Sequence, residues 1–582
     1  MDSPKNIDIM AEMNTYSSSI PLPEYAMNMA VLLQTNSVKF SDKPIYQDVQ
    51  NGTYTLLAWN KFFIRVKAIQ SWLLSNSFKR GDKMVFLSRN CQEMLELELA
   101  VMAMGGISVP IFSGYPADQA NRLLEFCEST FAAVADQDQF EKIKSPKNIK
   151  KIIYFSSLGN HDLVNLVPFA DLISHEPKSN EIMGLDIHPE TVSLMMYTSG
   201  TMGLPKCVQL THKNILSQQA AMKALWDLNH QDRFLSYLPW HHSFGGIFEK
   251  FAAVVNGAVL SLEHGYGKDL DILLNNWKKV KPTVFFSVPR IYQAIATRVM
   301  QDKEVEEMIF HDDLRFIFTA AAPLPKNIAD LFEDHGIPVV EGWGLTETSP
   351  CCTITDPTIT RKQGVVGKPI PGVLVKIADD GEILVKGPNV MTGYYHNPEA
   401  TAEVLVEDDW FKTGDVGEYT KTGLKLISRK DRIFKLINGK KVVPTEVENL
   451  IAKDCAYLAH AYLHGSGKDH PVLLVFPNKN LFSQKPDESL LSQDCKCPEG
   501  MDDYFNCLSD CLLKWNNAND TKFSRYKKAM LIDYELSIEN EELTPSMKLA
   551  PNVVGKVFKA EIESLYNPLE SKSEDVYIIN VE

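Results

Sequence analysis

Between residues 25 and 427 the chain alternates short apolar or β-branched runs with longer amphipathic stretches. The runs have the length of strands buried on both faces, and stretches such as 59–74 and 117–127 have the period of surface helices. Strands that alternate with helices are typical of parallel sheets covered by helices, so an α/β fold is predicted. The predicted strands are 83–87, 108–112, 151–155, 192–197, 258–262, 283–287 and 315–319.

The pattern changes near Gly364, where closely spaced strands with turn residues between them indicate a smaller β-rich subdomain. After residue 428 it changes again, to a mixed α+β region. The elements expected in these two regions are strands at 373–377, 382–385 and 440–443, helices at 445–452 and 553–566, and an exposed polar insertion at 478–498.

Three parts of the chain are therefore predicted. They are a polar N-terminal segment (1–24), a large N-terminal domain of helix-covered sheets (25–428) and a small α+β C-terminal domain (429–582). A length of 582 residues agrees with this division, because single hydrophobic cores stop growing at about 250–300 residues.

Composition and net charge limit the classes of partner that the protein is expected to bind. Hydrophobic residues at 45% and charged residues at 23% are ordinary for a globular enzyme. The 59 basic and 74 acidic side chains give a net charge of −15, which disfavours nucleic acid held by bulk electrostatics. Any site for an anionic ligand must gather its cations locally.

The sequence predicts neither a signal peptide nor a membrane span. Its most apolar stretch, 95–112, is interrupted by Glu96, Glu98 and a glycine pair. We expect a cytoplasmic protein with at most peripheral membrane contact. The 10 cysteines are expected to be reduced thiols, including a cluster whose spacing matches no zinc site: Cys495, Cys497, Cys507 and Cys511.

The segment 197–206 follows an apolar run and has the composition of a phosphate loop. Its glycines allow backbone N–H groups to approach an anion, its hydroxyl side chains can donate, and its final lysine can neutralise phosphate charge. It lacks the Gly-Lys-Ser/Thr ending of a Walker A loop, and a plain surface loop is the alternative interpretation. The expected binding residues are Thr198, Ser199, Gly200, Thr201, Gly203 and Lys206.

A second segment, 341–347, places two glycines around a tryptophan. Such a ring can stack on a flat base, a threonine can donate to phosphate, and a glutamate is a hard oxygen ligand suited to Mg²⁺. A glycine-rich turn is the alternative. The expected binding residues are Glu341, Gly342, Trp343, Gly344, Leu345 and Thr346, with Glu347 as a metal ligand.

The two motifs, in this order, resemble the phosphate-loop and adenine-binding segments of the acyl-adenylate-forming (AMP-binding) superfamily. The likeness covers nearly the whole chain and is closest to long-chain fatty acid–CoA ligases. Five further segments resemble segments of the family. They are 238–245, which contains His242; 319–324, which contains Ala321, Ala322 and Pro323; 410–415, which contains Asp415; 428–432, which contains Arg429; and 543–548, which contains Lys548.

The resemblance implies a role for each matching residue. Asp415 would hold the ribose hydroxyls, Arg429 the ribose or phosphate, and Lys548 the charge that grows on the α-phosphoryl group. It also implies that His242 borders the acyl site, that Thr201 and Glu347 hold Mg²⁺, and that Lys206 and Lys548 are catalytic. The resemblance further implies that the C-terminal domain is a mobile lid that swings about a hinge near Asp431. The swing would bring Lys435 to the site and place Gly439 where it leaves room for the pantetheine arm of coenzyme A.

The expected activity is a two-step ligation in which ATP and Mg²⁺ convert a medium- or long-chain fatty acid to acyl-AMP, and coenzyme A accepts the acyl group. The alternatives are an acyl-AMP ligase that loads a carrier protein, a luciferase-like oxygenase, and a nucleotide-binding homologue without turnover. Met202 and Cys207 depart from the family pattern, and the bulk of Cys207 is expected near Lys206.

Overall fold

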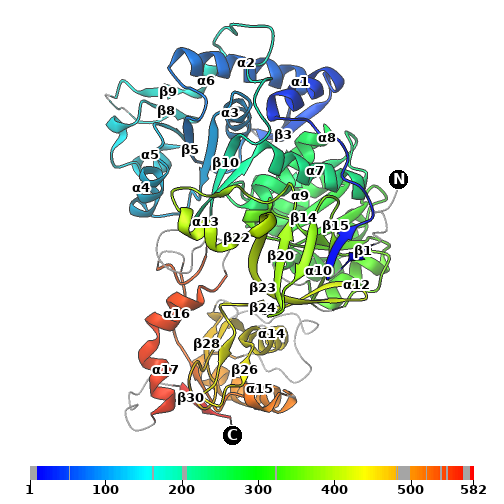
Figure 1. Ribbon diagram of the computed structural model, residues 1–582, viewed down its shortest axis with the longest axis vertical. Coiled ribbons are helices and arrows are strands. Elements are labelled where there is room, and N and C mark those ends of the chain that lie inside the picture. Colours follow the sequence, from blue (N-terminus) through cyan, green and yellow to red (C-terminus); the bar gives the residue numbers. More distant parts are fainter. Residues whose placement is uncertain are drawn as a thin grey trace.

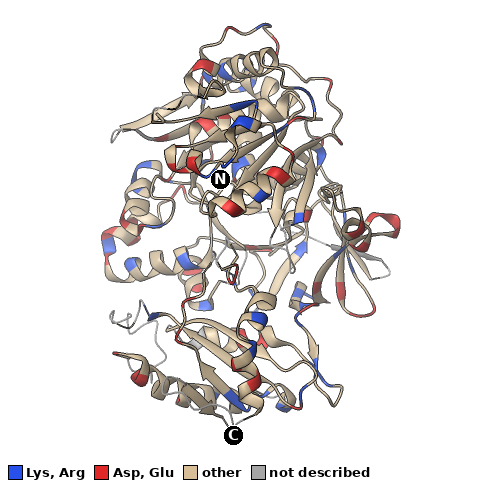
Figure 2. Ribbon diagram, turned by 90° about the vertical axis from the view of Figure 1, so that its left-hand side faces the viewer, with Lys and Arg blue, Asp and Glu red and all other residues tan. Residues whose placement is uncertain are grey.

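The computed structural model describes residues 9–12, 14–50, 53–159, 161, 163–198, 206–320, 324–362, 364–455, 457–479, 482, 498–519, 521–537, 540–544, 548–567 and 577–581. It shows a large body that carries the N-terminus and a smaller body that carries the C-terminus (Figure 1). Acidic and basic side chains are interspersed over both bodies (Figure 2).

One sheet of the large body has eight strands in the order β21-β11-β10-β6-β5-β7-β8-β9. Its strands from β10 to β9 run parallel, and β11 returns antiparallel beside β10. The bounds are β5 (Lys83–Leu87), β6 (Ile107–Ile111), β7 (Phe131–Val134), β8 (Lys151–Tyr154), β9 (Leu166–Pro168), β10 (Val192–Thr198), β11 (Lys206–Thr211) and β21 (Gly393–Tyr394).

The second sheet joins a parallel part, β16-β15-β14-β12-β13-β3, to an antiparallel part that contains the predicted β-rich region. The bounds are β1 (Ile9–Glu12), β2 (Thr15–Ser18), β3 (Pro44–Gln50), β4 (Thr53–Ala58), β12 (Arg233–Ser236), β13 (Val259–Leu262), β14 (Val284–Ser287), β15 (Phe316–Thr319), β16 (Val339–Trp343), β17 (Thr353–Ile354), β18 (Val365–Pro369), β19 (Leu374–Ile377), β20 (Glu382–Lys386), β22 (Leu405–Val406), β23 (Trp410–Thr420) and β24 (Gly423–Arg429).

Helices cover these sheets and bury aromatic side chains against them, for example Trp226 of α7 against Phe318 of β15 at 5.4 Å between ring centroids. The helices are α1 (Met29–Lys39), α2 (Trp59–Ser75), α3 (Gln92–Ala103), α4 (Ala117–Phe126), α5 (Gln137–Glu141), α6 (Phe169–Ile173), α7 (His212–Trp226), α8 (Lys250–Asn256), α9 (Leu270–Val280), α10 (Pro289–Gln301), α11 (Lys303–Ile309), α12 (Lys326–Asp334) and α13 (Pro398–Val404); short turns are η1 (Pro146–Asn148), η2 (Phe244–Glu249, a π-helix), η3 (Thr346–Thr348) and η4 (Glu407–Asp409).

The smaller body has a four-stranded sheet, β27-β28-β29-β30, and a separate two-stranded hairpin, β25-β26. The bounds are β25 (Phe434–Lys435), β26 (Lys441–Val442), β27 (Leu458–His464), β28 (Val472–Pro477), β29 (Lys528–Leu531), β30 (Tyr577–Asn580), α14 (Pro444–Asp454), α15 (Met501–Ala518), η7 (Lys522–Ser524), α16 (Pro551–Val557) and α17 (Lys559–Tyr566).

The α/β class predicted from the pattern is confirmed, with two differences in detail. The single helix expected at 553–566 is wrong, because the helix is interrupted at Phe558 (φ −98°, ψ 28°) and forms α16 and α17. The sequence pattern predicts no element in the N-terminal segment, yet β1 and β2 extend the sheet beyond β19. Most of the predicted insertion at 478–498 lies outside the described residues.

Parallel strands from both sheets end close to the site. Ile111 ends β6, Thr198 ends β10, Ser236 ends β12 and Trp343 ends β16. In open α/β sheets, ligands bind beyond the carboxyl ends of the strands. The fold therefore brings the predicted motifs, which are distant in sequence, to one region.

Candidate nucleotide and acyl site

The phosphate loop joins two paired strands, β10 and β11, whose ends Thr198 and Lys206 lie opposite each other. The Thr198 hydroxyl donates to the carbonyl oxygen of Lys206 at 3.4 Å, so both ends of the loop are fixed. The predicted residues between them, Ser199, Gly200, Thr201 and Gly203, lie outside the described residues, as does Met202.

Lys206 and Glu347 meet around a residue that the sequence analysis missed, Tyr394 of β21. The Lys206 Nζ lies 4.7 Å from the centroid of the tyrosine ring, and the tyrosine hydroxyl donates to Glu347 Oε1 at 2.8 Å. Burial and the charge of Glu347 hold the pKa of Tyr394 well above its ordinary value, so the hydroxyl remains a donor at neutral pH.

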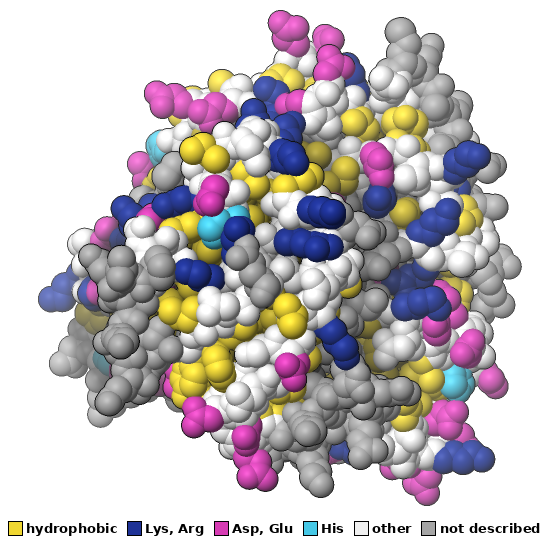
Figure 3. Space-filling view, turned by 90° about the horizontal axis from the view of Figure 1, so that it is seen from below, with side chains coloured by type: hydrophobic (Ala, Val, Ile, Leu, Met, Phe, Trp, Pro, Cys, Tyr) yellow, Lys and Arg dark blue, Asp and Glu magenta, His cyan; other side chains and the backbone are white. Residues whose placement is uncertain are grey.

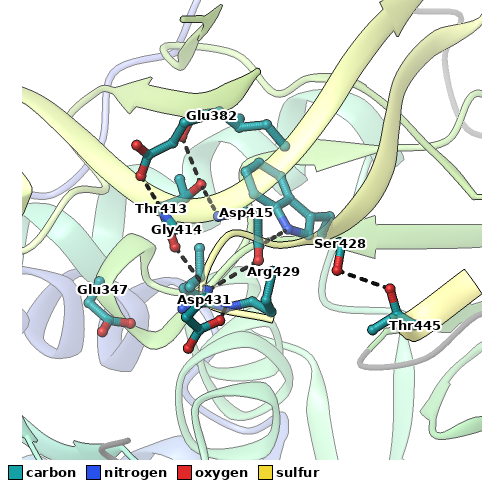
Figure 4. Close-up of polar contacts among 12 residues, drawn as sticks. Glu347, Glu382, Thr413, Gly414, Asp415, Ser428, Arg429, Asp431 and Thr445 are labelled. Carbon is teal, nitrogen blue, oxygen red and sulfur yellow. Dashed lines mark hydrogen bonds and ion pairs between the residues drawn. The ribbon is translucent and has the colours of Figure 1, made fainter. Parts of the chain in front are cut away.

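Asp415 accepts two hydrogen bonds within the protein (Figure 4). The indole Nε1 of Trp343 donates to Oδ2 at 2.9 Å, and Arg429 Nη1 donates to Oδ1 at 3.1 Å. Burial raises the pKa of Asp415, while Arg429 opposes this. Each carboxylate oxygen has a second acceptor position, so the carboxylate retains capacity for two ribose hydroxyls.

Arg429 is held between Asp415 and the chain that follows. Nη1 also donates to the carbonyl oxygen of Thr413 at 2.9 Å, and Nε lies 3.7 Å from Asp431 Oδ1. Burial would lower the pKa of the guanidinium, but the carboxylates of Asp415 and Asp431 raise it above its ordinary value. A Cβ at Gly414, where φ is +70°, would lie 2.9 Å from Arg429 Nη2, so this turn requires glycine.

The residues beside Asp431 are anchored to opposite bodies. Lys430 pairs with Asp380 and Glu382 of the large body at 2.7 and 2.6 Å. Arg432 pairs with Glu448 in α14 of the small body. A pivot at Asp431 would leave both pairs intact, and the hinge there stays a prediction.

Lys548 belongs to the small body but acts electrostatically on the large one. Its charge contributes to lowering the pKa of His242, after burial, and the carboxylate of Asp415 and the guanidinium of Arg429 influence the lysine in turn. Burial is the main cause that lowers the pKa of Lys548, although the side chain keeps solvent contact. The structure thus brings the predicted catalytic lysine to the site.

His241 and His242 lie in a loop held by Asn90, whose side chain donates to the carbonyl oxygen of Leu238 at 2.8 Å and accepts from the N–H of Trp240 at 2.9 Å. Burial lowers the pKa of His242 to about 4 and that of His241 to about 3. Both rings are therefore neutral at pH 7.

A cavity of about 110 Å³ lies beside these histidines. Its lining includes Thr544 of the small body, so it spans the two bodies. The lining residues are Pro110, Ile111, Phe112, Tyr115, Tyr197, Thr198, His241, His242, Thr346 and Thr544.

In the segment after β15 and along β16, several polar groups already form hydrogen bonds with other groups of the protein. The carboxylate of Glu341 accepts from Arg361 and from the N–H of Leu324, and Thr346 donates to the Ser243 hydroxyl at 3.2 Å. A Cβ at Gly344 would lie 1.8 Å from the carbonyl oxygen of Pro350. Gly342 and Gly344 flank Trp343, and the binding roles of Gly342 and Leu345 stay predictions. Ala321, Ala322 and Pro323 lie outside the described residues.

One sequence expectation differs from the arrangement found. Cys207 does not crowd Lys206, because neighbouring strand residues point to opposite faces and Cys207 is buried in the core beneath the sheet. Lys435 and Gly439 are exposed on the β25-β26 hairpin, and no hydrogen bond or ion pair within the described residues joins either to the site. Their predicted roles stay predictions.

Comparison with known proteins identifies the family. The AMP-binding enzyme family matches residues 33–395, and the AMP-binding enzyme C-terminal domain matches residues 431–570. The chain belongs to the AMP-binding enzyme family. This confirms the resemblance deduced from the motifs and assigns the chain to the AMP-forming acid–CoA ligases.

Several relatives align over most of the chain. The long-chain-fatty-acid–CoA ligase FadD15 of Mycobacterium bovis is 26% identical, over 93% of this chain and 97% of the relative. Long-chain-fatty-acid–CoA ligase 5 of Rattus norvegicus is 27% identical, over 89% and 85%. The fold matches O-succinylbenzoate coenzyme A synthetase of Bacillus subtilis in complex with ATP and magnesium ion, with a TM-score of 0.71, 21% identity, and coverage of 91% and 99%.

The cofactors predicted from the sequence, ATP, Mg²⁺ and coenzyme A, are those of this ligase family. Among the described helices, none combines the length and apolar character needed to cross a bilayer. No disulfide joins two of the described cysteines, which include Cys507 and Cys511, and Cys495 and Cys497 lie outside the described residues.

Proposed function

We propose that the protein activates a fatty acid as acyl-AMP with Mg·ATP and then transfers the acyl group to coenzyme A. One observation carries the proposal: Lys548 of the small body interacts electrostatically with Asp415 and Arg429 of the large body. The charge of Glu347 acts on Arg429 in turn, and Glu347 shares Tyr394 with Lys206. The chain as a whole carries a net charge of −15. A triphosphate site therefore requires a local concentration of cations, which these residues provide.

In the first half-reaction the carboxylate attacks the α-phosphorus, and the bond to pyrophosphate breaks. Lys548 would stabilise the charge that develops on the α-phosphoryl oxygens, and Lys206 the charge on the departing pyrophosphate. Asp415 and Arg429 would hold the ribose so that the α-phosphorus faces the acyl cavity. The neutral His242 would border the incoming carboxylate without repelling or protonating it.

The residues fit a magnesium ion bound jointly with ATP. No cluster of three or more His, Cys, Asp or Glu side chains in the described part of the chain could hold a metal unaided. Mg²⁺ is usually held by one or two carboxylates together with substrate phosphates. Glu347 would be that carboxylate, with Thr201 as the predicted second ligand, and the ion would neutralise phosphate charge.

Transfer to coenzyme A would use the β25-β26 hairpin after rotation near Asp431. Lys435 and Lys441 are paired across this hairpin and both are exposed. Like charges in opposite positions destabilise a strand pair, so the pair favours an anionic acceptor. Basic side chains also gather near the middle of the face seen in Figure 3.

The fatty-acid substrate rests on the relatives, two of which are named long-chain-fatty-acid–CoA ligases. The cavity of about 110 Å³ is smaller than the roughly 300–1,000 Å³ of most ligand pockets. It has room for the reacting end of a substrate, and a long acyl chain would require the lining side chains to move. Chain length is therefore the property to measure first.

The test is to incubate the protein with Mg²⁺, ATP, coenzyme A and saturated fatty acids of graded length, and to identify AMP and the thioester by mass spectrometry. The proposal predicts both products together, with a maximum at medium or long chain. Acyl-AMP without thioester would indicate a carrier-protein ligase instead. Neither product with any acid would contradict the proposal.

A further inference from the structure

Tyr394 links the phosphate-loop lysine to the predicted metal ligand. Its hydroxyl donates to Glu347 Oε1 at 2.8 Å, and its ring lies 4.7 Å from the Lys206 Nζ. Both Tyr394 and Glu347 are buried, which strengthens these contacts because water competes little for them.

The backbone fixes Tyr394 independently of its hydroxyl. Tyr394 pairs with Val208 of β11, and its N–H donates to the Thr401 hydroxyl at 2.9 Å. The N–H of Met391 donates to the carbonyl oxygen of Glu347 at 2.8 Å. Removing the hydroxyl alone should therefore leave the strand and the ring in place.

Tyr394 lies between two side chains of opposite charge, Lys206 and Glu347. A lysine and a glutamate that contact the same side chain could pair with each other, which would consume the cation meant for phosphate and the anion meant for metal. Within the described residues no ion pair joins Lys206 to Glu347; the tyrosine ring and hydroxyl stand between them. The hydroxyl occupies Oε1, and no described residue donates a hydrogen bond to Oε2.

We propose that Tyr394 is a positioning residue that separates Lys206 from Glu347 and orients the Glu347 carboxylate toward the Mg²⁺ of bound ATP. The inference rests on the proposed function, since it presumes an Mg·ATP site. Groups that hydrogen-bond to metal ligands commonly contribute about 10–100-fold to metal affinity or activity.

The test compares Tyr394→Phe with a matched control, Tyr395→Phe. Tyr395 is the next residue and its hydroxyl also donates to a carboxylate, Glu128 Oε2 at 2.7 Å, at an exposed position. Binding of α,β-methylene-ATP is measured by titration calorimetry with Mg²⁺ and with EDTA. The ratio of the two affinities reports the metal contribution without turnover.

Tyr394→Phe should reduce this ratio by about 10-fold, with binding in EDTA unchanged, and Tyr395→Phe should match the wild type. In a Glu347→Gln background, Tyr394→Phe should have no further effect on the ratio. An unchanged ratio in Tyr394→Phe, or an equal loss with and without Mg²⁺, would overturn the inference. A wild-type protein that binds no nucleotide would instead defeat the proposed function.

Discussion

Replacing Lys548 by methionine removes the cation that the small body brings to the α-phosphate and keeps most of the side-chain stem. Asp415 and Arg429 remain paired at 3.1 Å within the large body, so the nucleotide-binding groups there should stay in place. The loss should therefore fall on the chemical step of adenylation and leave ATP affinity nearly unchanged.

The magnitude follows from the position of the side chain. Two unit charges 4 Å apart interact by about 4 kcal/mol at an effective dielectric constant of 20. Removal of one preorganised stabilising donor costs enzymes about 2.7–4 kcal/mol, or about 10²–10³ in kcat. Because Lys548 keeps solvent contact, the lower end applies, and a decrease of about 100-fold is expected.

Two assays separate the half-reactions. Exchange of labelled pyrophosphate into ATP follows adenylation, and release of AMP from supplied acyl-AMP and coenzyme A follows thioester formation. Lys548→Met should slow the first by about 100-fold and the second by less than twofold. An equal loss in both assays would refute the assigned role.

The same residue predicts a pH dependence. Burial lowers the pKa of Lys548, with Arg429 acting in the same direction and Asp415 opposing it. Only the protonated amine can stabilise the phosphoryl charge, so adenylation should decline as pH rises through this lowered pKa. Arginine stays protonated in this range, so Lys548→Arg should move the decline to higher pH; an unmoved alkaline limb would assign it to another group.

Gly439→Leu should slow thioester formation and spare pyrophosphate exchange, whereas Gly336→Leu, at another open position with positive φ, should affect neither. Intact thioester formation in Gly439→Leu would contradict the predicted role of Gly439 in coenzyme A transfer. Lys250→Met leaves Glu98 buried without its partner at 2.5 Å and should lower the free energy of unfolding by about 3–5 kcal/mol, seen as a lower urea midpoint. Burial lowers the pKa of His212 from 6.5 to about 4. The contribution of the neutral ring to the free energy of unfolding should be complete above pH 6.5 and fall toward pH 4 by up to about 1.4 kcal/mol per pH unit. The difference between the urea midpoints at pH 7 and pH 5 should be smaller in His212→Gln than in the wild type.

Much of the fold could be predicted because strands buried in a parallel sheet have continuous apolar sequences. The predicted strand at 83–87 has the same bounds as β5. The predicted strand at 192–197 stops one residue short of the end of β10. The break between α16 and α17 could not be predicted, since nothing in the periodicity of 553–566 marks Phe558 as non-helical. The strand β2 is short and polar, and only its pairing with β1 and β19 reveals it.

The site shows the same limit. Residues within recognisable motifs, such as Lys206, Asp415 and Lys548, could be named because glycine, proline and hydroxyl neighbours mark them. Tyr394 was missed because its role depends on contacts with Lys206 and Glu347, which are distant in sequence. The Gly393-Tyr394-Tyr395 segment after a polar turn was the available signal, but it carried no chemistry by itself.

The most direct test of the account is pyrophosphate exchange in the absence of coenzyme A. With Mg²⁺, ATP and a fatty acid of suitable length, labelled pyrophosphate should enter ATP, and the exchange should vanish when the acid is omitted. Absence of exchange with every carboxylic acid tried, in a protein that still binds ATP, would contradict the claim that these residues form an acyl-adenylate.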